Sequence, residues 1–388
     1  MAVGQQGEFV AVVNDTNPKS SGKAYSLKIS GNNHAQLLGK KIGDEIDGMF
    51  VGEGESILSG YKLVITGGSG FIGSNLVAAL SERGVGPLVV CDRLDSDERQ
   101  ANLAKHNVAE IIEPGALFSW LAAHTGLVKT IFHLGASSAT TEMDYGFLLD
   151  NNFGVSLNLW RWCAEHDAAF IYASSAATYG DGSLGFDDDN GIAALSRLKP
   201  LNPYGWSKQL FDVQALLLSE AGYGPRQWVG LKFFNVYGPN EYHKGAQQSV
   251  TVQLHDQIFE SGRVRLFKSH RPDYENGSQL RDFIWVGDCV DIMLWLHDNP
   301  SVCGVFNCGT GTARSFRDLA LACFAAMEVE PAIDFIDTPP PIRDKYQYYT
   351  EAKMDRLRHA GWTLPFTSLE EGVARYIGDF LVTNDRYR

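Results

Sequence analysis

The side chains best suited to acid–base chemistry are a tyrosine and a lysine four residues apart, Tyr204 and Lys208, which follow Pro203. A proline in the first turn and the four-residue spacing predict that both side chains lie on one face of a helix. An ammonium group there can lower the pKa of the phenol, which prepares it to exchange a proton with a substrate alcohol. A Tyr-x-x-x-Lys pair also arises by chance, so its surroundings decide its meaning.

A serine at the end of a predicted strand supports this interpretation. The apolar run Phe170–Ala173 predicts a strand, and the sequence SSAATYG, which contains Ser175, follows it. Because ligands bind at the carboxyl ends of the strands in open α/β sheets, Ser175 is expected to face a ligand. With Tyr204 and Lys208 it forms a set typical of hydride transfer at a secondary alcohol on a dinucleotide-binding fold.

A glycine-rich turn indicates where the dinucleotide binds. A predicted strand over Lys62–Thr66 runs into GGSGFIG, and an amphipathic helix is expected over Phe71–Arg83. Gly67 permits the tight turn, Gly70 lets backbone N–H groups approach a pyrophosphate, and Gly73 allows the helix to pack closely on the strand. Together, strand, loop and helix predict dinucleotide binding.

An acidic residue and an arginine bear on which dinucleotide is bound. Asp92 ends the next predicted strand, Leu88–Cys91, at the place where an acid binds the adenosine ribose. Arg93 follows directly, and its guanidinium is suited to a 2′-phosphate, whereas Asp92 alone favours NAD. The pattern favours NADP, with NAD as the alternative and a solvated loop arginine as the simpler interpretation of Arg93.

Strand-length apolar runs alternate with helical periodicity from Tyr61 onward, which predicts βαβ units and a parallel sheet. Further strands are expected at Thr130–His133 and Val229–Phe233, with His133 packed in the core. We expect a Rossmann-like doubly wound parallel sheet with a smaller C-terminal α/β substrate domain. The expected division is a cofactor domain over 60–234, to which 282–310 returns, and a substrate domain over 235–281 and 311–388.

The first 59 residues differ, because short β-like runs at Glu8–Val13, Ala24–Ile29 and Met49–Val51 alternate with polar turns. A small all-β N-terminal unit is expected. The stretch GKAYSLKISGNNHAQLLGKKIGDEIDGMFVG, with GYKLVITGGS after it, resembles the N-terminal barrel of an archaeal and eukaryotic small-subunit ribosomal protein. This resemblance implies a natural or engineered fusion, for which a vestigial or solubilising role is favoured over RNA binding.

Composition limits the partners of the main body. The net charge of −13 and the lack of a Lys/Arg block argue against nucleic acid as a partner. No signal peptide and no apolar run of membrane-spanning length is visible, so a cytoplasmic protein without a membrane partner is expected. The six cysteines lack metal-ligand spacing, and no metal site is expected.

The motifs TGGSGFIG, SSAATYG, YGWSK and FFNVYGPNE resemble those of the extended short-chain dehydrogenase/reductases, from about Tyr61 to Ile377. Within that family, HLGASSATTEMD, LDNN, NVYGPNEYHKG and RDFIWVGDC resemble the heptose 6-epimerase subgroup of lipopolysaccharide core synthesis. The HKG element is the most diagnostic. The resemblance implies epimerisation of an ADP-sugar at C6 with tightly bound NADP, in a homo-oligomer that is a pentamer in the resembled group.

The resemblance also assigns roles to single positions. It implies that Lys244 joins Ser175, Tyr204 and Lys208 in the catalytic set. It implies cofactor contacts from Phe71, Ile72, Asp92, Arg93, Arg99, Leu134, Gly135, Ala136, Ser137, Ser138, Asn151, Tyr204, Lys208, Val236 and Lys244. It implies substrate contacts from Asn235, Ala246, Gln253, Phe267, Lys268, Ser269, His270, Arg281 and Tyr346. Arg281 suits a diphosphate and Phe267 suits a base.

The chain departs from the subgroup at several positions. Pro114 stands where the subgroup has a second cofactor-binding lysine, and Ala246 and Gln253 replace a serine and a histidine near the substrate. An insertion of roughly Arg271 to Leu280 lengthens the substrate loop. These changes leave the reaction type intact and the exact sugar open.

Other functions remain as alternatives. Dehydratases of this fold carry an acidic pair just after the catalytic Ser/Thr, where this chain has Ala176 and Ala177, and a 4-epimerase would not need Lys244. A non-catalytic NADP-binding protein would be expected to have lost Tyr204 or Lys208. The N-terminal segment could act as an RNA or ribosome adaptor. The simpler interpretations are a solvated loop lysine for Lys244 and packing for the aromatic residues near position 346.

Overall fold

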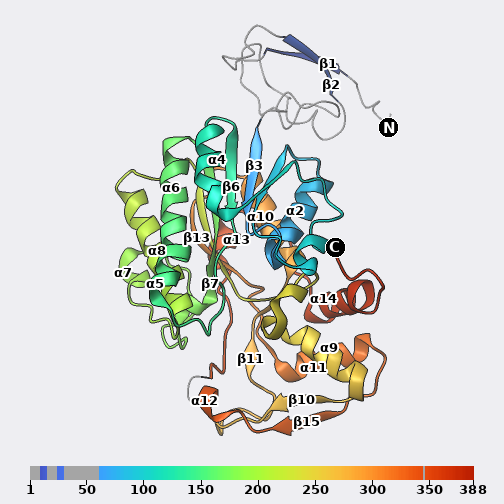
Figure 1. The fold of residues 1–388 in the computed structure, drawn as a ribbon. Helices are drawn as coiled ribbons and strands as arrows, with labels where there is room; N and C mark the ends of the chain where they lie inside the picture. The colour runs from blue at the N-terminus through green and yellow to red at the C-terminus, as the bar shows by residue number, and fades with distance from the viewer. Residues whose placement is uncertain (1–8, 15–23, 30–60, 344–345) are drawn as a thin grey trace, which may run out of the picture.

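The computed structural model describes residues 9–14, 24–29, 61–343 and 346–388 (Figure 1). At the N-terminus, strands β1 (Phe9–Asn14) and β2 (Ala24–Ile29) pair antiparallel, close to two of the three predicted β-like runs. The third predicted run, Met49–Val51, lies outside the described residues. The all-β N-terminal unit therefore stays a prediction.

A seven-stranded parallel sheet forms the centre of the main body, in the order β13-β8-β7-β6-β3-β4-β5. The direction of strand order reverses between β3 and β6, and in doubly wound sheets a ligand crevice opens at such a point. The Rossmann-like fold is thus confirmed. The strands are β3 (Lys62–Thr66), β4 (Leu88–Cys91), β5 (Glu110–Ile112), β6 (Val128–His133), β7 (Ala169–Ser175), β8 (Trp228–Phe233) and β13 (Gly304–Cys308).

The five strands predicted in this sheet are all present. Two have the predicted bounds, and β6, β7 and β8 begin one or two residues earlier than predicted. The sequence pattern does not predict β5 and β13 as strands. The short β5 has only one buried residue, Ile112, so its apolar signal is weak.

Helices cover both faces of the sheet (Figure 1). Helix α2 (Phe71–Glu82) packs against α10 (Val286–Asp298), and α6 (Val155–Glu165) packs against α8 (Pro203–Glu220). The predicted helix after the glycine-rich turn is confirmed, with Arg83 as its C-cap. The shorter helices of this half are α3 (Asp97–Ala101), η2 (Pro114–Ala116), α4 (Leu117–Ala123), α5 (Tyr145–Leu148), η3 (Leu149–Gly154), η4 (Ala176–Tyr179), α7 (Ile192–Leu195) and α13 (Asp355–His359).

A second hydrophobic cluster lies below the carboxyl edge of the sheet in Figure 1. It combines helices α9 (Val250–Ser261), α11 (Phe316–Ala326) and α14 (Leu369–Tyr376) with the parallel pair β10 (Val264–Phe267) and β15 (Ile333–Ile336). Phe71, at the start of α2, belongs to this cluster and so joins the two halves. The other elements are β9 (Asn235–Tyr237), η5 (Tyr242–Gln247), β11 (Leu280–Arg281), β12 (Phe283–Trp285), β14 (Arg314–Ser315), α12 (Pro340–Arg343) and η6 (Ile377–Leu381).

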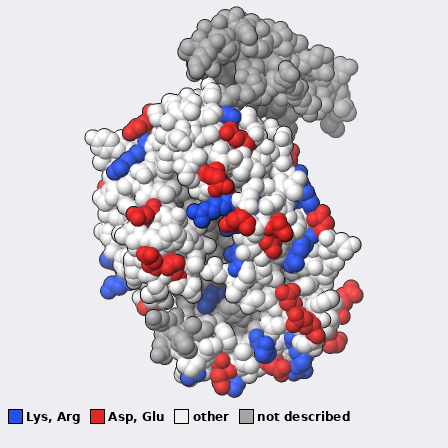
Figure 2. Space-filling view, in the orientation of Figure 1, with Lys and Arg blue, Asp and Glu red and all other residues white. Residues whose placement is uncertain are grey.

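The surface carries charges of both signs. Acidic and basic side chains are interspersed on the face shown in Figure 2, rather than gathered into a basic field. Among the described residues, no helix is both long enough and apolar enough to cross a membrane.

Candidate active site

The glycine-rich turn between β3 and α2 forms the floor of a cavity. Gly67 has φ +70°, and a Cβ there would lie 2.6 Å from the backbone nitrogen of Gly135. A Cβ on Gly73 would lie 2.1 Å from the carbonyl oxygen of Gly67. Glycine is therefore required at both positions, because a side chain on Gly67 would push apart the loops after β3 and β6, and one on Gly73 would push α2 away from the turn itself. Gly70 is the N-cap of α2, and no side chain caps this helix, so its first N–H groups are free to bind an anion.

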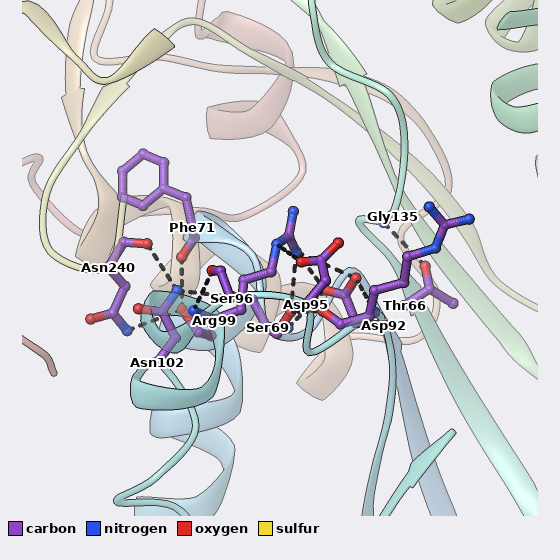
Figure 3. Close-up of polar contacts among 12 residues, drawn as sticks. Thr66, Ser69, Phe71, Asp92, Asp95, Ser96, Arg99, Asn102, Gly135 and Asn240 are labelled. Carbon is purple, nitrogen blue, oxygen red and sulfur yellow. Dashed lines mark hydrogen bonds and ion pairs between the residues drawn. The ribbon is translucent and has the colours of Figure 1, made fainter. Parts of the chain in front are cut away.

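Asp92, just after β4, is tied to the glycine-rich turn. Its Oδ2 accepts hydrogen bonds from the Ser69 backbone N–H at 3.0 Å and from the Ser69 hydroxyl at 2.7 Å. Nη1 of Arg99 lies 3.4 Å from the same carboxylate and donates to the Ser69 hydroxyl at 3.1 Å (Figure 3). The carboxylate thus fixes the turn and lies beside a guanidinium.

The predicted catalytic triad is assembled at the carboxyl end of β7 and the first turns of α8. Ser175 caps η4, and its hydroxyl accepts the N–H of Ala177 at 3.1 Å. Helix α8 begins at Pro203, close to the predicted start, and the side chain of Asn202 caps it. Ser175, Tyr204 and Lys208 line the same cavity.

Burial dominates the electrostatics of this triad. It raises the pKa of Tyr204, and the hydrogen bond with Ser175 opposes that shift. It lowers the pKa of Lys208 to about 8, and the negative charge of Asp212 opposes that shift. The sequence-based expectation that Lys208 lowers the pKa of the phenol is therefore not met, since burial raises this pKa and the opposing group is the hydroxyl of Ser175.

A fully buried ion pair lies behind the triad. Nζ of Lys232, in β8, is 2.7 Å from Oδ2 of Asp212, and both side chains are 0% exposed. Asp212 also accepts the hydroxyl of Ser174 at 2.7 Å, and Lys232 donates to the hydroxyl of Thr178 at 2.7 Å. Thr178 in turn donates to the carbonyl oxygen of Ser175 at 2.8 Å. The pair thus holds the chain around Ser175 through Ser174 and Thr178.

Lys244 lies on η5, on another wall of the cavity. Its Nζ is 5.1 Å from the ring centroid of Phe71 and 4.0 Å from Glu241. Burial lowers the pKa of Lys244, and Glu241 opposes that shift. Lys244 is thus placed in a cavity wall and not on a solvated loop. Burial lowers the pKa of the neighbouring His243 to about 4, which leaves that ring neutral at pH 7.

The cavity has a volume of about 480 Å³. It brings together most of the predicted cofactor and catalytic residues with one of the predicted substrate-side positions, Asn235. Its lining includes Gly67, Gly70, Phe71, Ile72, Gly73, Asp92, Arg99, Leu134, Gly135, Ala136, Ser138, Ser175, Tyr204, Lys208, Asn235, Val236 and Lys244. The sheet edge and η5 therefore form one site.

Other predicted cofactor residues lie beside the lining and not in it. The backbone N–H of Ser137 donates to Oδ1 of Asn152 at 2.9 Å, and the side chain of Asn151 donates to the same atom at 3.0 Å. Arg93 is exposed at the edge of the adenosine side. Ser137 and Asn151 thus support the site through Asn152, and Arg93 lies at its exposed edge.

The remaining predicted substrate residues form a separate group around Arg281. Its guanidinium lies between two rings, with its Cζ 5.4 Å from the centroid of Phe316 and 5.5 Å from that of Tyr346. Phe267 contacts Tyr346 edge-on. Burial lowers the pKa of Arg281, and no ion pair to it is found in the described part of the chain. A half-buried guanidinium of this kind is suited to an anionic group of a ligand.

The other members of this group hold the loop after β10. Lys268 pairs with Asp337 at 3.2 Å, and the His270 backbone N–H donates to the Tyr348 hydroxyl at 2.8 Å. The Ser269 hydroxyl donates to the Arg271 carbonyl at 2.8 Å. Nearer the cavity, Gln253 donates to the Gln248 carbonyl at 3.1 Å, and Ala246 lies on η5. The structure brings these positions to the substrate side without gathering them into one pocket.

Several residues of the site are not found by sequence reasoning. Ser69, Asp212, Lys232 and Glu241 each contact a predicted functional residue or its neighbour. The sequence does indicate Asp212, because this residue continues the four-residue spacing of Tyr204 and Lys208 along one helical face. His133 is packed, as predicted, and burial lowers its pKa to about 3.

Residues 63–309 match the model of the NAD dependent epimerase/dehydratase family. The chain belongs to this family. An ADP-L-glycero-D-manno-heptose-6-epimerase of Nitratidesulfovibrio vulgaris strain DP4 is 49% identical over 327 residues, which cover 84% of this chain and 99% of that protein. The enzyme of that name from Fusobacterium nucleatum is 43% identical, with 84% and 99% covered. The Helicobacter pylori enzyme structure has a TM-score of 0.69 at 27% identity, with 85% and 99% covered.

The N-terminal resemblance also has a match. Residues 11–87 match the model for ribosomal protein S6e, which overlaps the epimerase model from residue 63 to residue 87. In the structure, the overlapping residues form β3 and α2 of the main sheet. The epimerase fold therefore accounts for the shared segment.

Proposed function

We propose that this chain interconverts ADP-D-glycero-D-manno-heptose and ADP-L-glycero-D-manno-heptose by inverting C6, in lipopolysaccharide core synthesis. The observation that carries the proposal is the presence of two separate proton-handling groups, Tyr204 and Lys244, on different walls of one cavity above the glycine-rich turn. The name of the relatives that match almost end to end supports the choice of sugar and nucleotide.

An inversion at C6 needs more than proton transfer. The hydrogen on C6 is not acidified by a neighbouring carbonyl, so a base alone faces a prohibitive barrier. When bound, a nicotinamide cofactor supplies the oxidation of the alcohol and the re-reduction of the ketone. Rotation of the C6 group about its bond to the sugar ring presents the opposite face of the ketone, and its oxygen then points to a different wall.

The two walls of the cavity supply different acid–base groups. In one orientation the hydroxyl of Ser175 hydrogen-bonds the substrate oxygen, and Tyr204 takes the proton from that oxygen or returns it. In the other orientation Lys244 takes or returns the proton. Lys208, one turn along α8 from Tyr204, binds the nicotinamide ribose and keeps a positive charge beside the phenol. Two acid–base groups are needed because the oxygen does not stay in one place.

We infer that the cofactor is NADP. The glycine-rich turn fits a dinucleotide, because Gly70, Phe71 and Gly73 line the cavity at the N-terminus of α2, which no side chain caps. On the adenosine side, the Ser69 hydroxyl and backbone N–H already occupy the Asp92 carboxylate, and Arg99 lies beside it with Arg93 exposed nearby. Two guanidinium groups at this edge favour a 2′-phosphate. Mass spectrometry of the ligand released from purified protein distinguishes NADP from NAD.

We also propose a homo-oligomer. Apolar side chains of α5, η3 and α8 are exposed next to each other, and Tyr145, Leu149, Trp206 and Leu210 line a shallow groove between these helices. Large exposed apolar patches mark protein–protein interfaces.

The proposed domain division is 60–234 with 282–310 for the cofactor, 235–281 with 311–388 for the substrate, and 1–59 as an extension without a catalytic role. The cytoplasmic location stays a prediction.

Incubation of the purified protein with ADP-D-glycero-D-manno-heptose, without added cofactor, tests the proposed activity. The expected result is a mixture of the two C6 epimers, identified by sugar analysis, while the solution gains no reduced nicotinamide. Stoichiometric release of reduced cofactor as substrate disappears would instead make the protein a dehydrogenase. A protein that is folded and loaded with cofactor but leaves the sugar unchanged would overturn the proposal.

A further inference from the structure

A buried carboxylate lies beside Lys244. The side chain of Glu241 is 0% exposed, and its Oε2 is 4.0 Å from Nζ of Lys244, whose side chain is 25% exposed. The backbone N–H of Lys244 donates to the carbonyl oxygen of Glu241 at 3.0 Å, so both belong to one turn. Lys244 reaches from this turn towards Phe71 of the glycine-rich loop, and the ammonium lies between that ring and Glu241.

Glu241 is itself held by the start of the next helix, α9, and by the distant helix α14. The Ser249 hydroxyl donates to Oε1 at 2.6 Å, and the Ser249 backbone N–H, at the start of α9, donates to Oε2 at 2.5 Å. The hydroxyl of Tyr376, in α14, donates to Oε1 at 3.1 Å. Hydrogen bonds from α9 and α14 thus hold the Glu241 carboxylate in one position. This carboxylate in turn pairs with the side chain of Lys244 on η5.

The charges of the two groups depend on each other. Burial raises the pKa of Glu241, and Lys244 is the first group that opposes this shift. Burial lowers the pKa of Lys244, and Glu241 opposes it. Three other titratable side chains around them are neutral at pH 7, since burial lowers the pKa of His243 to about 4 and raises the pKa of Tyr242 and of Tyr376. The charged groups Arg99 and Asp92 act on His243 with opposite signs.

We propose that Glu241 is a positioning residue that keeps the ammonium of Lys244 charged and aimed at the cavity, so that Lys244 serves as the acid of the second substrate orientation. This inference rests on the proposed function. It assigns to the buried acid of the NVYGPNE segment a role that is separate from substrate or cofactor contact, because Glu241 is not among the residues that line the cavity.

Glu241→Gln tests this role with little change of shape. Two matched variants serve as controls: Glu260→Gln on the exposed face of α9, and Tyr376→Phe, which removes one hydrogen bond to Glu241 but leaves its charge. The reactivity of Lys244 towards acetic anhydride is measured against pH by mass spectrometry, because only the neutral amine reacts. Epimerisation rates on ADP-D-glycero-D-manno-heptose are measured in parallel.

In Glu241→Gln the midpoint of Lys244 acetylation is expected to fall by about 1 pH unit, since an adjacent opposite charge stabilises the protonated amine by roughly that much or more. The kcat is expected to fall about 10- to 100-fold with little change of KM. Glu260→Gln should change neither quantity, and Tyr376→Phe should leave the midpoint in place. A midpoint that does not move in Glu241→Gln overturns the inference, even if the rate falls.

If Glu241→Gln does not fold, Glu241→Asp replaces it, because the shorter carboxylate keeps its charge farther from Lys244. A smaller downward shift of the midpoint is then expected, and an unchanged midpoint counts against the role. The acetylation midpoint needs no turnover. A wild-type protein that does not epimerise the heptose therefore refutes the proposed function, whereas an unshifted midpoint refutes only the role of Glu241.

Discussion

The proposed cofactor side of the cavity and the proposed substrate side, around Arg281, differ in how their polar groups are satisfied. On the cofactor side, Asp92 accepts two hydrogen bonds from Ser69, and both residues lie within one β-α-β unit. On the substrate side, Arg281 lies half-buried between two aromatic rings, and no ion pair to it is found in the described part of the chain. The carboxylate of Asp92 has its hydrogen-bond partners without a ligand. The guanidinium of Arg281 instead has a positive charge that an anionic ligand could pair with. Substitutions should therefore change catalysis and stability on the first side and substrate affinity on the second.

The catalytic groups should show the largest effects. Tyr204→Phe and Lys244→Met are each expected to slow epimerisation about 10²- to 10⁴-fold, because each removes a positioned acid–base group. Both variants should retain the cofactor, whose binding is measured by release and mass spectrometry. A Lys244→Met variant with the wild-type rate would show that Lys244 has no acid–base role.

The buried ion pair behind the triad should have the next largest effect. Asp212→Asn leaves Lys232 charged and unpaired in the core, which is expected to lower the free energy of unfolding by about 3–5 kcal/mol. Replacing both residues, as Asp212→Leu with Lys232→Met, should recover most of that loss, as measured by chemical denaturation. Activity should stay low in the double variant if the pair positions Ser175, and a return to wild-type activity would show that the pair serves stability alone.

Arg281 tests the substrate side directly. Arg281→Gln is expected to raise KM for the ADP-sugar about 10- to 100-fold, because charge-assisted hydrogen bonds to a diphosphate contribute about 1.5–3 kcal/mol. Cofactor content should stay unchanged, since Arg281 lies apart from the glycine-rich turn. Loss of bound cofactor in this variant would show that the cofactor side and the substrate side do not act separately.

The smallest expected effect is on cofactor choice. Arg99→Ala is expected to weaken NADP binding about tenfold relative to NAD, because one of two guanidinium groups near the 2′-position is lost. The measurement is the ratio of the two dissociation constants after the bound cofactor is removed. An equal loss for both cofactors would mean that Arg99 supports the turn through Ser69 and does not read the phosphate.

The same contrast explains what the sequence can predict. The cofactor side is encoded in short segments, because glycine spacing, a strand and an acid at its end fix Gly67, Gly73 and Asp92 without distant contacts. Helix α8 is equally local, since its cap and its four-residue spacing place Tyr204 and Lys208 together.

The substrate side depends on contacts between distant segments. Arg281 meets Phe316 and Tyr346, and Glu241 meets Tyr376, across 35 or more residues of chain. No local pattern predicts such pairs, so only the resemblance to a family pointed to Arg281, and nothing pointed to Glu241. The buried partner Lys232 lies within a strand otherwise made of apolar and aromatic residues and glycine, where its charge has no local explanation.

The central claim is that C6 is inverted by oxidation and re-reduction within one cavity. Turnover of ADP-D-glycero-D-manno-heptose in D₂O tests it most directly, with deuterium at C6 of the product read by NMR or mass spectrometry. If the hydrogen removed from C6 is kept in the site and returned, both epimers contain no solvent deuterium at C6. Substantial deuterium at C6 would contradict the account, because it would mean that the hydrogen leaves as a proton and exchanges with water.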